Sequence, residues 1–159
     1  MLTLDQIARR TNNFRRMGSK FVRFTDTKKG YLSNGNGYIA AASYSTHRID
    51  SAGRAYVNQQ PSKYVTVFEF LDTQLHVNIS CSCEDNTYRW EWALWNRGAA
   101  EIEYSNGDAP DIRNPTYKAA CCKHAYALYQ KIKPKLPQPK AEGGQQTFNN
   151  KGVMIQKKK

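Results

Sequence analysis

The amino-acid sequence predicts an α+β fold, in which an N-terminal helix and a later helix accompany a small antiparallel β-sheet. Apolar side chains recur at helical spacing near the N-terminus and again in residues 116–133, whereas residues 20–83 alternate between apolar and polar side chains. A chain of 159 residues corresponds to about one domain, because domains contain roughly 100–200 residues. We therefore assign residues 1–18 to an N-terminal basic amphipathic helix, 19–134 to an α+β domain and 135–159 to an extended basic tail.

The N-terminal stretch LTLDQIARRTNNFRRMG is predicted to form a single amphipathic helix. Thr3 is a suitable N-cap and Gly18 is a suitable stop. One face of this helix is apolar and consists of Leu4, Ile7, Ala8, Thr11 and Phe14. The other face carries four arginines, which are Arg9, Arg10, Arg15 and Arg16. These arginines indicate either a solvated surface or a surface that contacts the phosphate groups of a nucleic acid.

Residues 20–83 are predicted to form antiparallel strands, because the alternating segments are interrupted by the turn motifs KKG and NGNG. The GNG motif lacks the Lys-Ser/Thr pair of a phosphate-binding loop, so we exclude such a loop. Residues 62–83 contain two apolar strands joined by LDTQ, and the second strand ends near Cys81 and Cys83. Side chains at positions i and i+2 of a strand share one face, so both sulfur atoms are able to reach a common point.

Residues 88–115 are rich in aromatic side chains and then in loop-forming residues. Two sets of side chains recur at helical spacing, namely Tyr88, Trp92 and Trp95 on one face and Trp90 and Leu94 on another. This pattern predicts a short, largely buried helix, whose tryptophans form an apolar wall beside the cysteine hairpin. Stacking of the same aromatic side chains on nucleobases is the alternative.

The stretch TYKAACCKHAYALYQKIK is predicted to form the last helix, which ends before Pro134. Its apolar face consists of Ala125, Leu128, Tyr129 and Ile132. The tail that follows is rich in Pro, Gly and Gln, and residues 131–159 contain eight lysines against one acidic residue, Glu142. We expect this tail to become ordered only on docking. Its lysines would then contact acidic residues or phosphates, and they include Lys157, Lys158 and Lys159.

Four potential metal ligands are distributed over two short motifs, Cys81-x-Cys83 and Cys122-x-His124. A set of three cysteines and one histidine is typical of zinc, which prefers tetrahedral sulfur and imidazole coordination, and four protein ligands are typical of a structural zinc site. Cys121 is an alternative to Cys122, because it lies three residues before His124. A set of buried cysteines without a metal ion is a further alternative.

The combination CSC…CKH resembles the SWIM zinc finger. In that family a Cys-x-Cys pair on a β-hairpin is followed, after a variable insert, by a Cys-x-His pair at the start of a helix. The resemblance covers residues 79–130 and implies that the four residues of the two motifs, with Cys122 rather than Cys121, bind one structural Zn²⁺ ion. The same stretch, with its aromatic insert and its YSNG motif, is also similar to a variant in tailed-bacteriophage proteins. This similarity implies a virion component, and SWIM domains in general are associated with DNA or protein binding.

The composition restricts the classes of function and location. The chain has 24 Lys and Arg residues against 13 Asp and Glu residues, a formal net charge of +11, which fits a solvated basic surface or a polyanionic partner. No secretory signal and no apolar run of membrane-spanning length is visible, so we expect the virion or the host cytoplasm, where cysteines remain reduced. The deaminase zinc signature is absent, and spacing supports no Ser-His-Asp arrangement.

The sequence therefore predicts a non-enzymatic, zinc-binding structural or assembly protein, which would be a bacteriophage virion component in contact with other virion proteins. A nucleic-acid-binding accessory protein, which uses the arginine helix and the lysine tail on phosphates, is the alternative. Neither a membrane partner nor a small-molecule substrate is expected.

Overall fold

A four-stranded antiparallel β-sheet forms the centre of the fold in the computed structural model, which describes residues 1–136, 146–148 and 154–156. The strands, in spatial order, are β1 (Val22–Tyr31), β2 (Gly37–Ser45), β5 (Tyr64–Phe70) and β6 (Val77–Cys81). Every neighbouring pair is antiparallel. Together with the helices described below, this sheet confirms the predicted α+β class.

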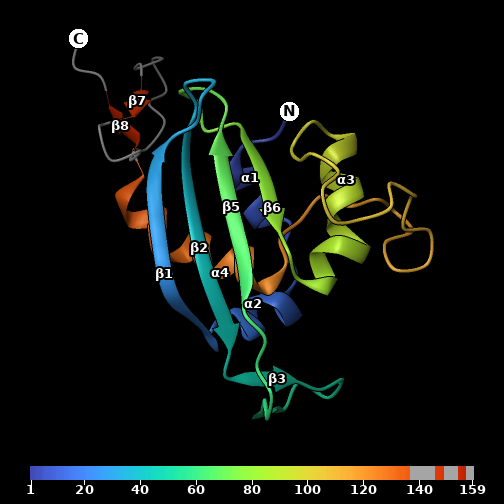
Figure 1. Ribbon diagram of the computed structural model, residues 1–159. Coiled ribbons are helices and arrows are strands. Elements are labelled where there is room, and N and C mark those ends of the chain that lie inside the picture. Colours follow the sequence, from blue (N-terminus) through green and yellow to red (C-terminus); the bar gives the residue numbers. More distant parts are fainter. Residues whose placement is uncertain (137–145, 149–153, 157–159) are drawn as a thin grey trace.

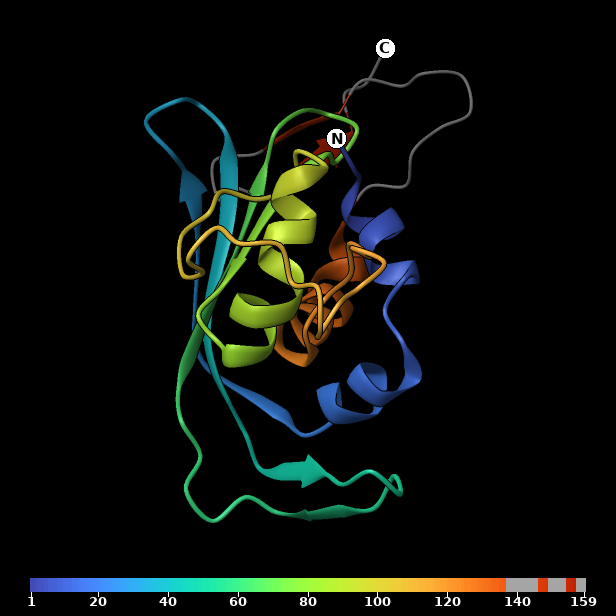
Figure 2. The ribbon, with the colours of Figure 1, turned by 90° about the vertical axis from the view of Figure 1, so that its right-hand side faces the viewer.

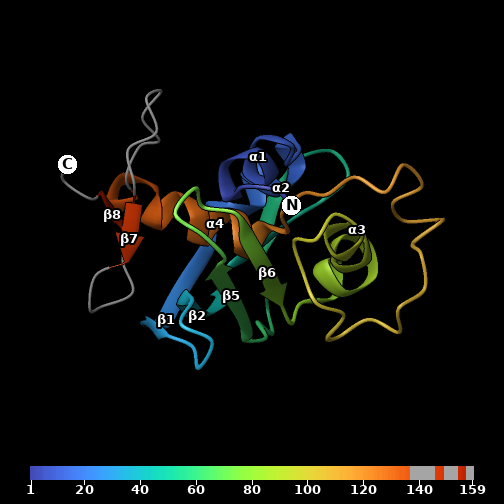
Figure 3. The same ribbon diagram turned by 90° about the horizontal axis from the view of Figure 1, so that it is seen from above.

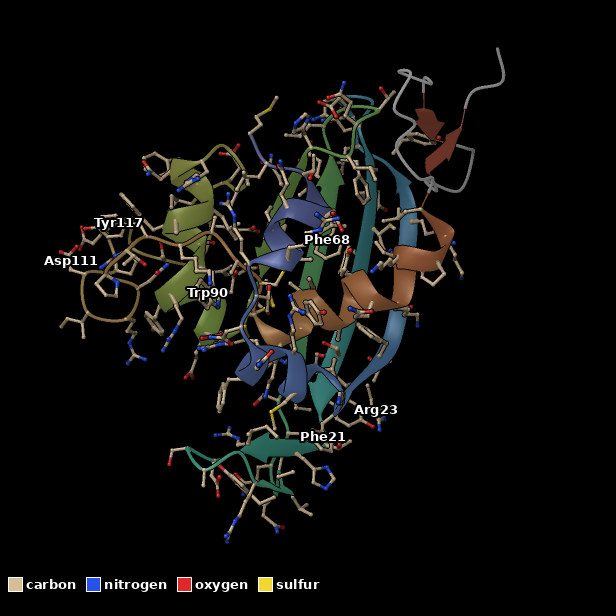
Figure 4. All side chains as sticks on the ribbon, turned by 180° about the vertical axis from the view of Figure 1, so that it is seen from behind. Phe21, Arg23, Phe68, Trp90, Asp111 and Tyr117 are labelled. Atoms are coloured by element: carbon tan, nitrogen blue, oxygen red, sulfur yellow. The ribbon has the colours of Figure 1, made fainter. Side chains whose placement is uncertain are left out.

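The sheet has one covered face and one open face. Side chains of β2 and β5 alternate between buried and more exposed positions, and the buried ones include Ile39 and Phe68. Phe68, at the centre of this face, is fully buried (Figure 4). The helices on this face are α1 (Leu4–Arg9), α2 (Asn13–Ser19) and α4 (Lys123–Ile132) (Figure 1). Among the described residues no helix covers the opposite face (Figure 3), so the hydrophobic core lies between the sheet and these three helices.

The N-terminal segment contains two short helices instead of the single helix that its apolar spacing predicts. Thr3 starts α1 through a capping box, in which its side chain accepts a hydrogen bond from the Gln6 amide at 3.2 Å. Asn12 ends the helical run because its side chain caps α2, accepting a hydrogen bond from the Arg15 amide at 3.0 Å. Phe14, which we expected on the apolar face, is 45% exposed as a result of this break.

A second hairpin, which the sequence pattern does not predict, connects β2 to β5. It consists of β3 (His47–Ile49) and β4 (Ala55–Val57), which pair in antiparallel fashion. Asp50 shapes its turn, because Oδ1 accepts hydrogen bonds from the amides of Ala52 and Arg54 at 3.0 and 2.8 Å. This hairpin runs beneath α2 (Figure 2) and forms one wall of a cavity described below.

The insert between β6 and α4 begins with a π-helical segment (Asn86–Trp90) that continues into α3 (Glu91–Asn96) beside the edge of the sheet (Figure 1). Glu91, only 1% exposed, organises the loop that follows. Its carboxylate accepts hydrogen bonds from three consecutive backbone amides, those of Glu103, Tyr104 and Ser105, at 2.6–3.2 Å. The insert is therefore attached to the domain through a buried charge.

The prediction of a largely buried insert helix is only partly confirmed. Trp90 and Leu94 are buried, but Tyr88 and Trp95 are 57% and 46% exposed. The helix changes from π to α geometry between residues 90 and 91. Because a π-helical turn contains more residues than an α-helical turn, the spacing of the aromatic residues no longer places them on two buried faces.

The C-terminal helix α4 begins at Lys123, so residues 116–122 of the stretch predicted as the last helix are not helical. It ends near Pro134, as predicted, and passes into a 3-10 turn (Lys133–Lys135). Beyond residue 136 the structure describes only β7 (Gln146–Phe148) and β8 (Met154–Gln156), which pair with each other. The predicted tail thus contains a strand pair, whereas residues 137–145, 149–153 and 157–159, including Lys157, Lys158 and Lys159, lie outside the described residues. None of the helices in the described part of the chain combines the length and the apolar character that a membrane crossing requires.

Candidate metal centre

The structure brings the four predicted ligand residues together from two elements that are distant in sequence. Cys81 is the last residue of β6, and Cys83 follows two residues later. Cys122 is the N-cap of α4, and His124 is the second residue of that helix. All four side chains are buried, and their ligand atoms lie within 4.8 Å of one another. Ligands about 2.0–2.3 Å from one ion lie roughly 3.3–3.8 Å apart in a tetrahedron, so a small contraction lets the cluster hold one metal ion.

Each of the three sulfur atoms also accepts one hydrogen bond from the protein. The donor–acceptor pairs are Thr66 Oγ1 to Cys81 at 3.3 Å, the Asn86 amide to Cys83 at 3.3 Å and the Ala125 amide to Cys122 at 3.4 Å. Hydrogen bonds of this kind stabilise a thiolate, which is the form that binds metal ions. Sequence reasoning missed these donors, because one of them belongs to the neighbouring strand β5 and the other two are backbone groups.

His124 has the environment expected of a metal ligand. Both of its ring nitrogens are buried and have no hydrogen-bond partner in the described residues. Its ring packs against that of Tyr64, with a centroid distance of 5.1 Å. Buried polar atoms nearly always have a partner, so these orphaned nitrogens support a ligand at this place.

The sulfur atoms differ in their affinity for protons. Hydrogen bonds from Cys122 and from Cys83 lower the pKa of Cys81 well below its ordinary value. Burial raises the pKa of Cys122, and its hydrogen bonds with the other two thiols raise it further. Hydrogen bonds within the cluster therefore favour the thiolate form of Cys81, and the thiolate is the form that binds a metal ion.

The geometry favours Cys122 over Cys121, the alternative that the sequence left open. Cys121 is buried but does not belong to the cluster. Its amide donates a hydrogen bond to Thr11 Oγ1 at 3.1 Å, and burial raises the pKa of its thiol to about 12. These properties are those of a small core residue.

Trp90, and not the predicted Trp92 and Trp95, is the tryptophan that packs in the same hydrophobic core as the cysteines. Trp90 shares the hydrophobic core with the cysteines, and its indole donates a hydrogen bond to Asp85 at 2.9 Å. Trp92 instead contacts the rings of Trp95 and Tyr117, at centroid distances of 5.9 and 4.9 Å. Figure 4 shows Tyr117 on the outer part of the insert, away from Trp90. The prediction that Trp92 and Trp95 wall the metal site is not supported by these contacts.

Arg15 connects α2 to the loop that follows Cys83. Its guanidinium group donates two hydrogen bonds to the Asp85 carboxylate, at 2.8 and 3.2 Å, and lies 5.3 Å from the centroid of the Trp90 ring. Only 12% of the Arg15 side chain is exposed. A solvated location is therefore wrong for this arginine, whose main contacts are intramolecular.

The other arginines of the predicted basic helix lie nearer the surface. Arg9 forms an ion pair with Asp5 at 2.8 Å, and Arg10 is half-buried. Arg16 donates hydrogen bonds to the carbonyl oxygens of Thr11 and Arg9, at 2.8 and 3.1 Å. The break at Asn12 thus separates these arginines, and they do not form one continuous helical face.

A cavity of about 320 Å³ reaches the centre from the surface. Cys83 and His124 are among its lining residues, together with Lys123 and, from the β3–β4 hairpin, Arg48. Burial lowers the pKa of Lys123, and the nearby Arg48 charge lowers it further.

Comparisons with protein-family models, with curated proteins and with solved structures give no match. The cluster of three cysteines and one histidine is consistent with a zinc finger. The more specific resemblance to SWIM domains and to phage proteins remains a prediction from sequence.

Proposed function

We propose that this chain is a non-enzymatic protein whose fold is stabilised by one structural Zn²⁺ ion bound to Cys81, Cys83, Cys122 and His124. The observation that carries the proposal is the burial and closeness of these side chains, whose ligand atoms lie within 4.8 Å of one another. Four protein ligands fill the tetrahedral coordination of zinc and leave no position for a substrate or a water molecule. A structural role is therefore better supported than a catalytic role.

The types of ligand support zinc over other common metal ions. Calcium and magnesium prefer oxygen ligands, and no carboxylate of the described residues belongs to the cluster. Sulfur with imidazole in a tetrahedral arrangement is typical of zinc.

The position of the ion explains how it would stabilise the domain. Cys81 and Cys83 belong to the β5–β6 hairpin, whereas Cys122 and His124 belong to the start of α4. An ion shared by the two pairs joins the sheet to the helix layer and closes a loop that contains the whole insert. Because the four ligands come together only in the folded chain, the free energy of metal binding adds to the free energy of folding.

We further propose that the zinc-stabilised domain acts in assembly, docking on neighbouring proteins of a bacteriophage particle. The support is the resemblance of the metal-binding stretch, including its aromatic insert and YSNG motif, to tailed-bacteriophage proteins. Mass spectrometry of purified particles tests this role, and presence of the chain in infected cells but not in particles would contradict it.

Removal of the metal is expected to unfold the core of the domain. The four ligand residues lie in or beside the main hydrophobic core, so an empty site leaves an orphaned imidazole and three thiols there. Structural zinc contributes about 10–16 kcal/mol of apparent free energy in small zinc fingers. A strong chelator should abolish the near-ultraviolet circular dichroism of the buried aromatic residues, and added Zn²⁺ should restore it. An unchanged spectrum and an unchanged urea midpoint after complete metal removal would show that no structural metal is present.

A further inference from the structure

Residues of α2, the start of β1 and the C-terminal half of α4 line a basic groove. It lies at the β1 edge of the sheet, whereas the insert with α3 lies beside the β6 edge (Figure 1, Figure 3). Its volume is about 660 Å³. Three cationic residues line it, Arg16, Lys20 and Lys131, together with the aromatic rings of Phe24 and Tyr126. None of the acidic residues in the described part of the chain lines this groove.

Neutral partners hold two of these cations in place. Arg16 donates hydrogen bonds to two backbone carbonyl oxygens, at 2.8 and 3.1 Å, and its guanidinium carbon lies 5.3 Å from the centroid of the Tyr126 ring. The ammonium group of Lys131 lies 4.9 Å from the centroid of the Phe24 ring. Carbonyl groups and aromatic rings orient a cation without neutralising its charge. The groove therefore presents positive charge that is already positioned.

Arg23 lies on β1 between the groove residues Val22 and Phe24, but it does not itself line the groove. Its side chain donates hydrogen bonds to the carbonyl oxygens of Lys20 and Val22, at 2.9 and 3.2 Å (Figure 4). No ion pair of the described residues involves Arg16, Lys20, Arg23 or Lys131. The positive charge of this surface is thus free to interact with an external anion.

Charge is also segregated along the chain. Residues 9–29, which contribute α2 and part of β1, contain eight basic residues against one acidic residue. Residues 84–111, which belong mostly to the insert, contain seven acidic residues against two arginines. Two of the eight, Arg9 and Arg15, form ion pairs with Asp5 and Asp85. The remaining basic residues of this segment still exceed its acidic residues, and such an excess of positive charge attracts a polyanion.

We infer that the groove formed by Arg16, Lys20 and Lys131 binds the phosphodiester backbone of a nucleic acid, independently of base sequence. Cations without acidic partners neutralise phosphates and release the counterions that these had bound, which favours association. The inference goes beyond the zinc-stabilised assembly role, because it assigns a different surface and a different partner. It retains Arg16 from the interface predicted from sequence and adds Lys20 and Lys131, but it does not include Arg15, which pairs with Asp85.

The groove fits a nucleic acid better than an acidic protein surface. Protein interfaces usually have an apolar centre surrounded by polar groups. Here the two rings of the groove lie under Arg16 and Lys131, so charge dominates over apolar area. Ser19 and Gln130, which also line the groove, add hydroxyl and amide groups that are able to donate to phosphate oxygens.

The test compares two charge-matched double variants of the full-length, zinc-loaded chain. Lys20→Glu with Lys131→Glu reverses two charges in the groove, whereas Lys63→Glu with Lys118→Glu reverses two exposed charges that do not line it. Binding to a short DNA duplex of mixed sequence, and to its single-stranded form, is measured at several salt concentrations. Zinc content and circular dichroism confirm that both variants are folded, and the lysine tail contributes equally to both.

The groove variant is expected to bind DNA at least about tenfold more weakly than the control variant at low salt. Its plot of log K against log salt concentration should be shallower by about two, since two phosphate contacts are lost. The preferred form of DNA identifies whether the groove accepts a duplex or a single strand. Equal DNA binding by the two variants would overturn the inference. So would wild-type binding to polyglutamate of matched charge that is as strong as binding to DNA, since this would assign the groove to acidic proteins.

Discussion

Replacement of Cys122 by alanine is expected to remove the metal ion and most of the stability of the domain, whereas replacement of the adjacent Cys121 is expected to retain both. Cys122 provides one of four ligand atoms, and its loss leaves an incomplete site within the core. The expected decrease in stability is a large part of the about 10–16 kcal/mol associated with structural zinc. Zinc content and urea unfolding of the two variants provide the measurement.

Cys121→Ala is a closely matched control, because the two cysteines are neighbours in sequence and both are fully buried. Its expected cost is about 1 kcal/mol, typical of a small truncation in a core. If Cys121→Ala lost the zinc ion and Cys122→Ala kept it, Cys121 would be the ligand and the assignment based on geometry would be wrong.

Glu91→Gln is expected to destabilise the protein by on the order of 3 kcal/mol, the largest effect that we predict for a substitution outside the metal centre. The Glu91 carboxylate is buried and accepts hydrogen bonds from three backbone amides. Glutamine has nearly the same shape but no charge, and its NH₂ group is unable to accept a hydrogen bond. Urea unfolding of the zinc-loaded variant measures the loss.

Hydrogen exchange shows whether Glu91→Gln loosens only the loop that contains residues 103–105 or destabilises the whole domain. In Glu91→Gln the amides of Glu103, Tyr104 and Ser105 should exchange much faster than in the wild type, because they lose their acceptor. Glu101→Gln removes an exposed carboxylate from the same loop and should leave both stability and exchange unchanged. Unaltered exchange of the three amides in Glu91→Gln would show that this carboxylate does not hold the loop.

The cysteine and histidine cluster was predictable from sequence because its spacing and its local structure agree. Cys81 at a strand end and Cys122 at a helix start follow from short-range patterns, alternation before the first and helical spacing after the second. The existence of a covered sheet follows from the same alternation. Both predictions depend on residues that are close in sequence.

The features that sequence reasoning missed have two causes. Some depend on contacts between residues that are distant in sequence, and others depend on local backbone structure, such as a helix cap or a π-helical turn, that apolar spacing does not reveal. Arg15 and Asp85 are 70 positions apart, so nothing near Arg15 reveals its partner. The apolar spacing continues through Asn12, although its side chain caps a new helix there. The exposure of Trp95 follows from a π-helical segment that its own spacing does not indicate.

The central claim, one metal ion bound by three cysteines and one histidine, is tested most directly by X-ray absorption spectroscopy of the purified, zinc-loaded, full-length protein. We predict one zinc per chain, with three sulfur ligands at about 2.3 Å and one nitrogen ligand at about 2.0–2.1 Å. If the spectrum showed four sulfur ligands and no nitrogen, Cys121 would be a ligand in place of His124. A shell of oxygen and nitrogen atoms without sulfur, or protein without bound zinc, would contradict the claim.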